Sequence, residues 1–214
     1  MPDLSVRSNE TELMDDPSRP DSEFVEAYRE LTAVNKHLGG IRAIERFLPA
    51  DAKTVLDVAS GGCDIGEALA GSRQCRVVSL DMNPRGLKMA AQTAPVAGDA
   101  LQLPFADGTF DAVYCSLFFH HLNNTDCVAV LREMWRVARR IVIVNDLHRT
   151  MVAHASIRVI SALFSRSVMF QHDAAASVRR AFRPAELEAI ALKAGINAKV
   201  HRSFPYRLVL VAVK

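Results

Sequence analysis

VLDVASGGCDIG, residues 55–66, is the most informative stretch of this chain. An apolar run typical of a buried strand leads into a turn of small residues, and the turn opens a helix. Small residues in such a turn let the backbone approach a ligand at the helix N-terminus, at the carboxyl edge of a sheet. The stretch favours a binding site for a nucleotide-like ligand over the alternative, a purely structural tight turn.

Short apolar runs alternate with helical stretches around this turn and beyond it. The helical stretches lie near residues 64–71, 84–92 and 125–138. Strands that alternate with helices imply right-handed crossovers and a parallel sheet. The apolar runs predict five buried strands, at residues 53–59, 75–81, 95–99, 110–116 and 140–146.

The N-terminal segment has a different character. Residues 1–20 are polar and predict a loose arm. A helix is expected to begin at Asp21 or Ser22 and to run to about Val34, and a second helix is expected after the break at Gly39. These helices would form a cap next to the sheet.

The C-terminal third completes the predicted fold. Residues 148–166 predict a helix, whereas 167–180 have no clear period and predict a loop or lid. A further helix is expected from Pro184 to Gly195, and two strands around Pro205 predict an antiparallel hairpin at the sheet edge. The fold class is α/β: a doubly wound, Rossmann-like, mostly parallel seven-stranded sheet with an antiparallel C-terminal hairpin and an N-terminal helical cap.

Composition narrows the class of protein. The 214 residues are 50% hydrophobic, enough for a real core, and a net charge of +2 does not indicate a nucleic-acid partner. The four cysteines show no zinc-like spacing, and no metal is expected. The sequence contains no signal-peptide pattern and no apolar run long enough for a membrane span, so we expect a cytoplasmic protein. The oligomeric state stays open.

Charge is unevenly distributed along the chain. Residues 1–30 contain nine acids and three arginines, whereas residues 132–183 contain ten arginines and three acids. The favoured interpretation is that the basic stretch is solvated or neutralised by the acidic arm. The alternative is that some arginines bind an anionic substrate or carrier, since a guanidinium binds carboxylate and phosphate well.

Acidic residues stand at the ends of two further predicted strands. Asp81 follows Gly61 by twenty residues, where a carboxylate can accept hydrogen bonds from ribose hydroxyls. Asp99 ends the third strand, where it could accept the exocyclic amine of adenine. Each acid alone is more often a cap or turn residue. Three ordered features on three successive strand ends favour a nucleoside site.

These motifs resemble those of class I S-adenosylmethionine-dependent methyltransferases. The resemblance rests on VLDVASGGCDIG, on VVSLDMNP and on GDALQLPFADGTFDAVYCSLFFHHL, within residues 50–146. It implies an N-terminal arm and cap at 1–48 and a methyltransferase domain at 49–214, with a lid segment at 147–183. It also implies S-adenosylmethionine as the cofactor, bound by residues at the ends of the first three strands: Asp57, Ala59, Gly61, Asp81, Met82, Asp99 and Ala100.

Two positions depart from the family's glycine pattern. Ala59 and Cys63 replace its first and third glycines, and a positive φ at Ala59 would be strained. The departures leave open a weaker cofactor affinity, or a scaffold protein that has lost catalysis. A nicotinamide-dependent dehydrogenase is disfavoured, because Asp64 occupies the place of the glycine that packs its helix on its strand.

Histidines follow the fourth and fifth strands. His120, His121 and His148 compete for the role of a base, and Asp146 would orient one of them. Each lies at the carboxyl edge, where this fold places its substrate.

The expected acceptor is a small molecule, apolar or aromatic, because Leu117, Phe118 and Phe119 and the apolar 151–170 segment could cover it. A nucleobase acceptor is disfavoured, since the Asn/Asp-Pro-Pro-aromatic motif of such enzymes is absent. The leading hypothesis is O-methylation of a phenolic or enolic hydroxyl of a secondary metabolite. The alternative is C-methylation of an activated aromatic or quinone ring, although the arginine–asparagine ending typical of quinone-ring methyltransferases is missing.

Overall fold

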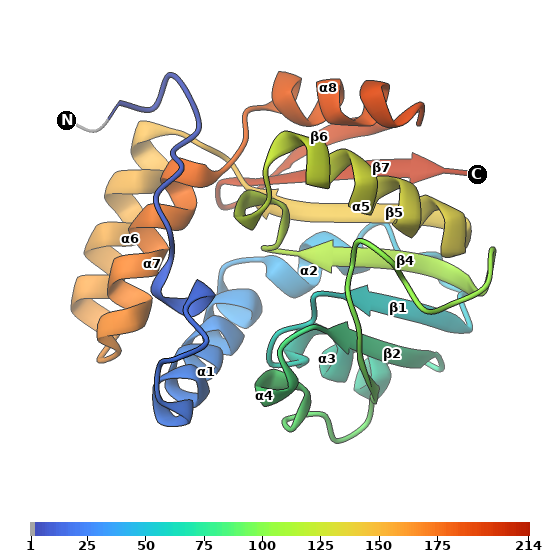
Figure 1. The fold of residues 1–214 in the computed structure, drawn as a ribbon, viewed down its shortest axis with the longest axis horizontal. Coiled ribbons are helices and arrows are strands. Elements are labelled where there is room, and N and C mark those ends of the chain that lie inside the picture. The colour runs from blue at the N-terminus through green and yellow to red at the C-terminus, as the bar shows by residue number, and fades with distance from the viewer. Residues whose placement is uncertain (1–2) are drawn as a thin grey trace.

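The computed structural model describes residues 3–214, so Met1 and Pro2, the start of the predicted arm, lie outside the described residues. Its centre is a seven-stranded sheet in the order β3-β2-β1-β4-β5-β7-β6 (Figure 1). Strands β1 to β5 pair in parallel, while β7 pairs antiparallel with both β5 and β6. The strands are β1 Thr54–Val58, β2 Arg76–Asp81, β3 Ala94–Ala97, β4 Phe110–Ser116, β5 Ala138–Leu147, β6 Lys199–Ser203 and β7 Arg207–Val213. This sheet confirms the predicted fold class.

Helices cover both faces of the sheet and bury two hydrophobic cores. One core joins the sheet to α5 and α8, and the other joins it to α2 and α3. The central strands are apolar almost throughout because each is covered on both sides. The helices are α1 Asp21–His37, α2 Gly40–Glu45, α3 Asp64–Ser72, α4 Pro84–Leu87, α5 Asn124–Val137, α6 Met151–Phe164, α7 Val168–Arg180 and α8 Pro184–Ala194.

The strand order reverses between β1 and β4. From β1 the chain moves outward to β2 and β3, then crosses back to β4 on the other side. At such a switch point the connections leave in opposite directions and open a crevice at the carboxyl edge of the sheet. The glycine-rich turn, Asp81 and His120 all lie at this edge.

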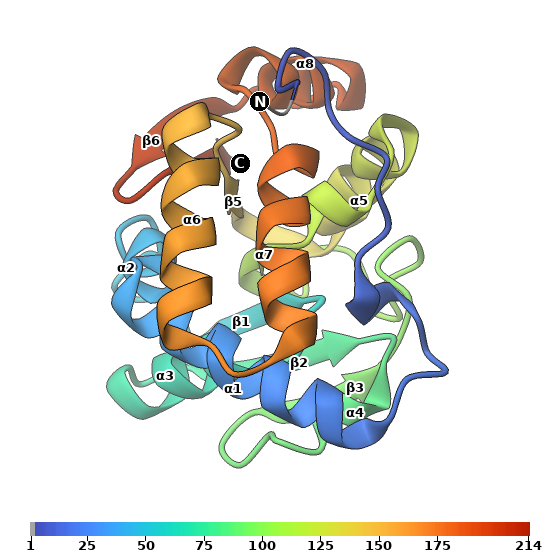
Figure 2. The same cartoon turned by 90° about the vertical axis from the view of Figure 1, so that its left-hand side faces the viewer.

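The prediction of a loop at residues 167–180 is wrong, because Val168–Arg180 form helix α7. Ser167 caps the helix by accepting a hydrogen bond from the backbone N–H of Phe170. Neighbours cover α7 on more than one side, so its buried positions include Asp173, Ser177 and Arg180 as well as apolar residues, which hides the helical period. Figure 2 shows α6 and α7 side by side as a helical hairpin, with α1 beneath their connection.

The arm is docked rather than loose. Leu4 and Glu12 are buried, and the Arg7 guanidinium donates to the carbonyl oxygen of Leu122. Asp173 in α7 accepts the backbone N–H groups of Leu13 and Met14, which holds the short 3-10 helix at Leu13–Asp15. The composition of the arm predicts disorder, but contacts with α7, which is distant in the sequence, order it.

The helix predicted at 84–92 is also shorter than expected and ends at Leu87. The Glu67 carboxylate accepts the backbone N–H groups of Ala91, Gln92 and Thr93, which holds this segment outside a helix. The connection to β3 therefore runs as an irregular loop.

The acidic arm neutralises part of the basic stretch, as predicted. Glu10 forms an ion pair with Arg179, and Asp15 forms one with Arg180 at 2.9 Å. Within the described part of the chain, no helix is both long and apolar enough to cross a membrane.

Candidate functional site

A cavity of about 760 Å³ lies at the carboxyl edge of the sheet, bounded also by the arm, α1, α6 and α7. All seven predicted cofactor residues line it, from Asp57 to Ala100. His120 and His121 line it as well, whereas His148 and Asp146 do not. The structure therefore brings together most of the predicted site and leaves His148 outside.

The glycine-rich turn takes a left-handed backbone at three positions. The φ angles are 55° at Ala59, 51° at Gly61 and 61° at Cys63. The Gly61 N–H donates to Asp81 Oδ2 at 2.8 Å, which joins the turn to the end of β2. The expected strain at Ala59 is therefore real, because a Cβ is disfavoured at positive φ.

Ala59→Gly is expected to raise the free energy of unfolding by about 0.5–1 kcal/mol. Glycine removes the strain at positive φ, and its greater freedom in the unfolded chain offsets part of the gain. Urea denaturation monitored by circular dichroism measures the change. Ala70→Gly, inside α3, is the matched control and should lower stability by about the same amount. A loss of stability in Ala59→Gly would contradict the strain.

The three strand-end acids differ in environment. Asp57 is buried, and burial raises its pKa well above the usual range. Burial also raises the pKa of Asp81, although its oxygens accept backbone N–H groups from Asn83 and Gly61. Asp99 is exposed and accepts the Leu101 N–H at 2.8 Å. Carboxylate oxygens have more than one lone pair, so Asp81 and Asp99 keep capacity for a ligand.

His120 is the best-positioned histidine in the cavity. Its Nδ1 lies 2.7 Å from Asp146 Oδ1, and its backbone N–H donates to Asp146 Oδ2 at 3.0 Å. Burial opposes ionisation of Asp146, but His120 outweighs it and the pKa of Asp146 falls below its usual value. This contact favours the tautomer with Nδ1 protonated, which leaves Nε2 as an acceptor; the orienting role of Asp146 stays a prediction.

The arm contributes acids that the sequence did not reveal. Asp15 Oδ1 lies 2.9 Å from His121 Nδ1, and its other oxygen accepts from Arg180. Glu12 is buried beside both histidines, and burial raises its pKa to about 7. No motif or period marks Glu12, because its position depends on the docking of the arm on α7.

An apolar region of the cavity lies beside the histidines. Leu117 and Phe118 line it, together with Ile157 and Ile160 of α6. Phe119, which was expected here, is fully buried in the core instead. Residues of the predicted 151–170 cover thus line the cavity, from α6 and from the start of α7.

His148 is the predicted catalytic residue that the structure does not support. It pairs with Phe182 in an isolated bridge and does not line the cavity. Burial and the neighbouring Arg202 and Arg183 lower its pKa. Its place directly after β5 is as predicted, but it does not line the cavity, whereas the preceding Leu147 does.

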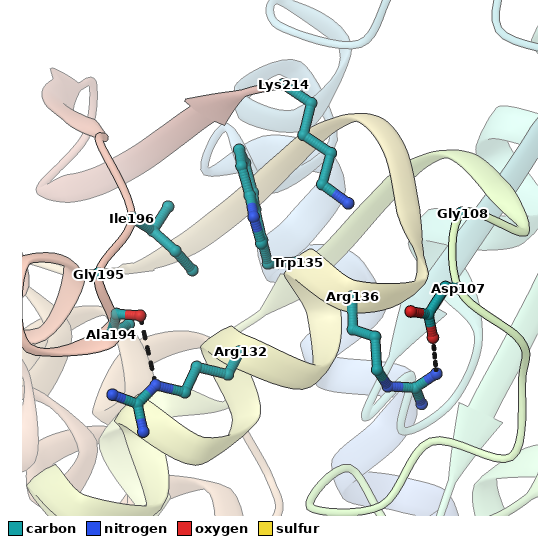
Figure 3. A pocket seen from close by; sticks show the side chains of 9 residues that line it. All are labelled: Asp107, Gly108, Arg132, Trp135, Arg136, Ala194, Gly195, Ile196 and Lys214. Atoms are coloured by element: carbon teal, nitrogen blue, oxygen red, sulfur yellow. Dashed lines mark hydrogen bonds and ion pairs between the residues drawn. The ribbon is translucent and has the colours of Figure 1, made fainter.

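A second hollow, of about 560 Å³, lies near the C-terminus (Figure 3). Its charged side chains are occupied with local partners: Arg136 forms an ion pair with Asp107, and Arg132 donates to the Ala194 carbonyl. Lys214 lies over the Trp135 ring. None of the predicted cofactor-binding or catalytic residues lines this hollow, so the larger cavity is the candidate site.

Comparisons with known proteins show which proteins this chain resembles. The family model described as a methyltransferase domain matches residues 56–144. A protein of Deinococcus radiodurans named demethylmenaquinone methyltransferase is 38% identical over 114 residues, which cover 47% of this chain and 46% of that protein. A protein of the same name from Renibacterium salmoninarum is 34% identical over 126 residues, or 53% of this chain and 52% of its own length. The chain thus matches about half the length of these relatives.

Solved structures share the whole fold. A SAM-dependent methyltransferase from Aquifex aeolicus superimposes with a TM-score of 0.67, covering 92% of this chain and 99% of its own. Its sequence identity is 16%, so this likeness concerns the fold.

Proposed function

Because the chain belongs to the class I S-adenosylmethionine-dependent methyltransferases, we propose that it methylates a small apolar acceptor bound beneath α6 and α7. The main support for this proposal is that one cavity is lined both by the strand-end acids Asp57, Asp81 and Asp99 and by His120. His120 is in turn held by Asp146. Cofactor residues and a positioned base thus share one space. In this proposal α6 and α7, within the 147–183 segment, form the lid.

The residues present fit S-adenosylmethionine. Gly61 and its neighbours leave the turn without bulky side chains beside the cavity, and Asp57 lies behind the turn. Asp81 would accept the ribose hydroxyls, while Asp99, Ala100 and Met82 would border the adenine. When bound, this cofactor supplies an electrophilic methyl group on its sulfonium.

We further propose a hydroxylated aromatic ring as the acceptor, with a ring carbon as the methylated atom. His120 Nε2 would take the proton of a ring hydroxyl, which raises the electron density on the neighbouring ring carbon. That carbon would take the methyl group as the bond from the methyl group to the sulfonium sulfur breaks. Loss of the carbon's own proton to solvent would then restore the aromatic ring. Asp146 would stabilise the imidazolium that forms. The relatives named demethylmenaquinone methyltransferase support carbon over oxygen, although they match only about half of their length.

Methylation of the hydroxyl oxygen is the second candidate, since the same base would prepare the same oxygen. The products differ in the NMR shift of the new methyl group, which separates O-CH₃ from C-CH₃. The protein should be incubated with 13C-methyl S-adenosylmethionine and a naphthohydroquinone. A carbon-bound label supports the proposal, and an oxygen-bound label contradicts its second part alone.

Asp81→Ala is expected to weaken S-adenosylmethionine binding by about 1–3 kcal/mol, or roughly 5- to 150-fold. The variant loses charge-assisted hydrogen bonds to the ribose and also the partner of the Gly61 N–H. Titration calorimetry measures the affinity. Asp107→Ala, in the second hollow, is the matched control. An unchanged affinity in Asp81→Ala would exclude the ribose role, and absence of any heat with the unaltered protein would favour a scaffold protein.

A further inference from the structure

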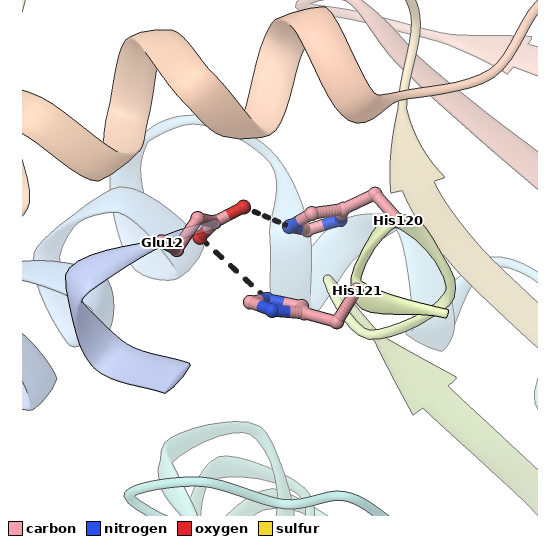
Figure 4. A group of neighbouring side chains, drawn as sticks. All are labelled: Glu12, His120 and His121. Carbon is pink, nitrogen blue, oxygen red and sulfur yellow. Dashed lines mark ion pairs between the residues drawn. The ribbon is translucent and has the colours of Figure 1, made fainter. Parts of the chain in front are cut away.

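Three side chains converge in the acceptor half of the cavity, from two segments far apart in the sequence. Figure 4 shows Glu12 of the arm facing the His120 and His121 rings, which come from the turn after β4. His120 Nε2 lies 3.6 Å from Glu12 Oε1, and His121 Nε2 lies 3.7 Å from Glu12 Oε2. One ligand atom from each residue can be chosen so that all three lie within 4.8 Å of one another.

These contacts are not hydrogen bonds. The distances exceed the 2.7–3.2 Å typical of N–H···O bonds, and Glu12 Oε1 is a buried oxygen without a hydrogen-bond partner. Each histidine has its Nδ1 against a carboxylate, Asp146 for His120 and Asp15 for His121. With Nδ1 protonated, each Nε2 presents a lone pair to the Glu12 carboxylate. Either a proton on the Glu12 carboxyl or a cation between these atoms would relieve the repulsion between the facing lone pairs.

The spacing fits a metal ion as that cation. Two ligand atoms on a tetrahedral ion with bonds of about 2.0–2.1 Å are separated by about 3.4 Å. Histidines that bind metals usually donate their other ring N–H to a carboxylate, and both histidines do so here.

The local charge also fits. The carboxylates of Glu12, Asp15 and Asp146 contact the cluster. Two guanidiniums lie beside it: Arg180 Nη1 is 3.6 Å from Glu12 Oε1, and Arg7 Nη2 donates to the His120 carbonyl oxygen at 3.3 Å. With neutral imidazoles and three ionised carboxylates these groups sum to one negative charge, so the surroundings favour a cation. Arg180 contacts the carboxylates of Glu12 and Asp15. It also donates to the backbone carbonyls of His120 and His121, so it links the arm to the histidine turn.

We propose that Glu12, His120 and His121 bind one divalent transition-metal ion. Two imidazoles and a carboxylate suit Zn²⁺, Mn²⁺, Fe²⁺ or Co²⁺ and leave a coordination position open toward the cavity. This deepens the proposed function and rests on it in one respect: the open position would receive the acceptor's hydroxyl oxygen. In the metal-bound protein His120 would be a ligand, and the ion would lower the pKa of the bound hydroxyl so that its proton is lost to solvent.

The test is direct metal binding. Protein stripped with EDTA and dialysed should bind one Zn²⁺ per chain in calorimetry, and Co²⁺ should give the visible absorption of a low-coordinate N/O site. Glu12→Gln and His121→Asn should each weaken Zn²⁺ binding at least tenfold. Asp15→Asn, which alters only the outer carboxylate, should weaken it about 10- to 100-fold.

Two matched controls should bind as the unaltered protein does. Glu10→Gln changes another arm glutamate, and His201→Asn changes a histidine on β6 that stacks on Phe47. Circular dichroism and S-adenosylmethionine calorimetry confirm that each variant folds. The metal site is wrong if the unaltered protein binds neither Zn²⁺ nor Co²⁺ at millimolar concentration. It is also wrong if Glu12→Gln and His121→Asn bind Zn²⁺ as tightly as the unaltered protein does. Neither result affects the proposed methyl transfer, which fails separately if the folded protein binds no S-adenosylmethionine or yields no methylated product.

Discussion

His120→Gln is expected to lower kcat for methyl transfer by about 10²- to 10⁴-fold, the usual contribution of a positioned acid–base group. Glutamine keeps an amide near Asp146 but has no basic nitrogen for the acceptor hydroxyl. The loss should appear in kcat, because His120 is not one of the strand-end residues proposed to hold the cofactor and is held instead by Asp146. Affinity for S-adenosylmethionine should change less than about threefold. Steady-state kinetics with the naphthohydroquinone and calorimetry with the cofactor measure the two quantities.

The other histidines are the controls for this result. His148→Gln should leave kcat within about twofold, because His148 lies outside the cavity against Phe182. His121→Gln should have an intermediate effect, since His121 faces the cavity but pairs with the partly exposed Asp15. Full turnover in His120→Gln would show that the reaction needs only positioning of the acceptor. The same loss of kcat is expected if His120 acts as a metal ligand.

The sheet and the cofactor edge could be predicted from sequence because their signals are local. A buried strand is an apolar run, and a turn that admits a ligand needs small residues, so VLDVASGGCDIG marks both without any knowledge of the fold. Strand alternation then places Asp81 and Asp99 at the same edge as Gly61. The structure confirms these positions as residues lining one cavity.

The parts that sequence reasoning missed depend on long-range contacts. Helix α7 lacks an amphipathic period because its buried positions include ionic groups such as Asp173, which holds the arm. Glu12 has no local pattern at all and gains its place only when the arm docks. His148 shows the reverse error: it follows a strand end, as predicted, but it bridges to Phe182 and does not line the cavity.

Gly86→Ala is expected to disturb the cofactor site although Gly86 does not itself line the cavity. A Cβ on Gly86 would lie 1.9 Å from the Gly61 carbonyl oxygen and 2.5 Å from its carbonyl carbon. Both atoms belong to backbone, so neither can rotate away, and α4 or the glycine-rich turn must move. We expect the free energy of unfolding to fall by about 3 kcal/mol, at the upper end for overpacking.

The same displacement should separate the Gly61 N–H from Asp81, because the clash is with the carbonyl group of Gly61, the residue whose N–H donates to Asp81. Affinity for S-adenosylmethionine is then expected to fall about 100-fold, which corresponds to about 2.7 kcal/mol. Urea denaturation and calorimetry measure the two effects. Gly71→Ala in α3 is the matched control: its Cβ would meet only the Gln92 side chain at 3.6 Å, an ordinary contact. Because alanine favours helix over glycine, this control should be slightly more stable and should bind the cofactor normally. Normal cofactor binding by Gly86→Ala would mean that the turn can shift without loss, and that Gly61 does not need the position seen here.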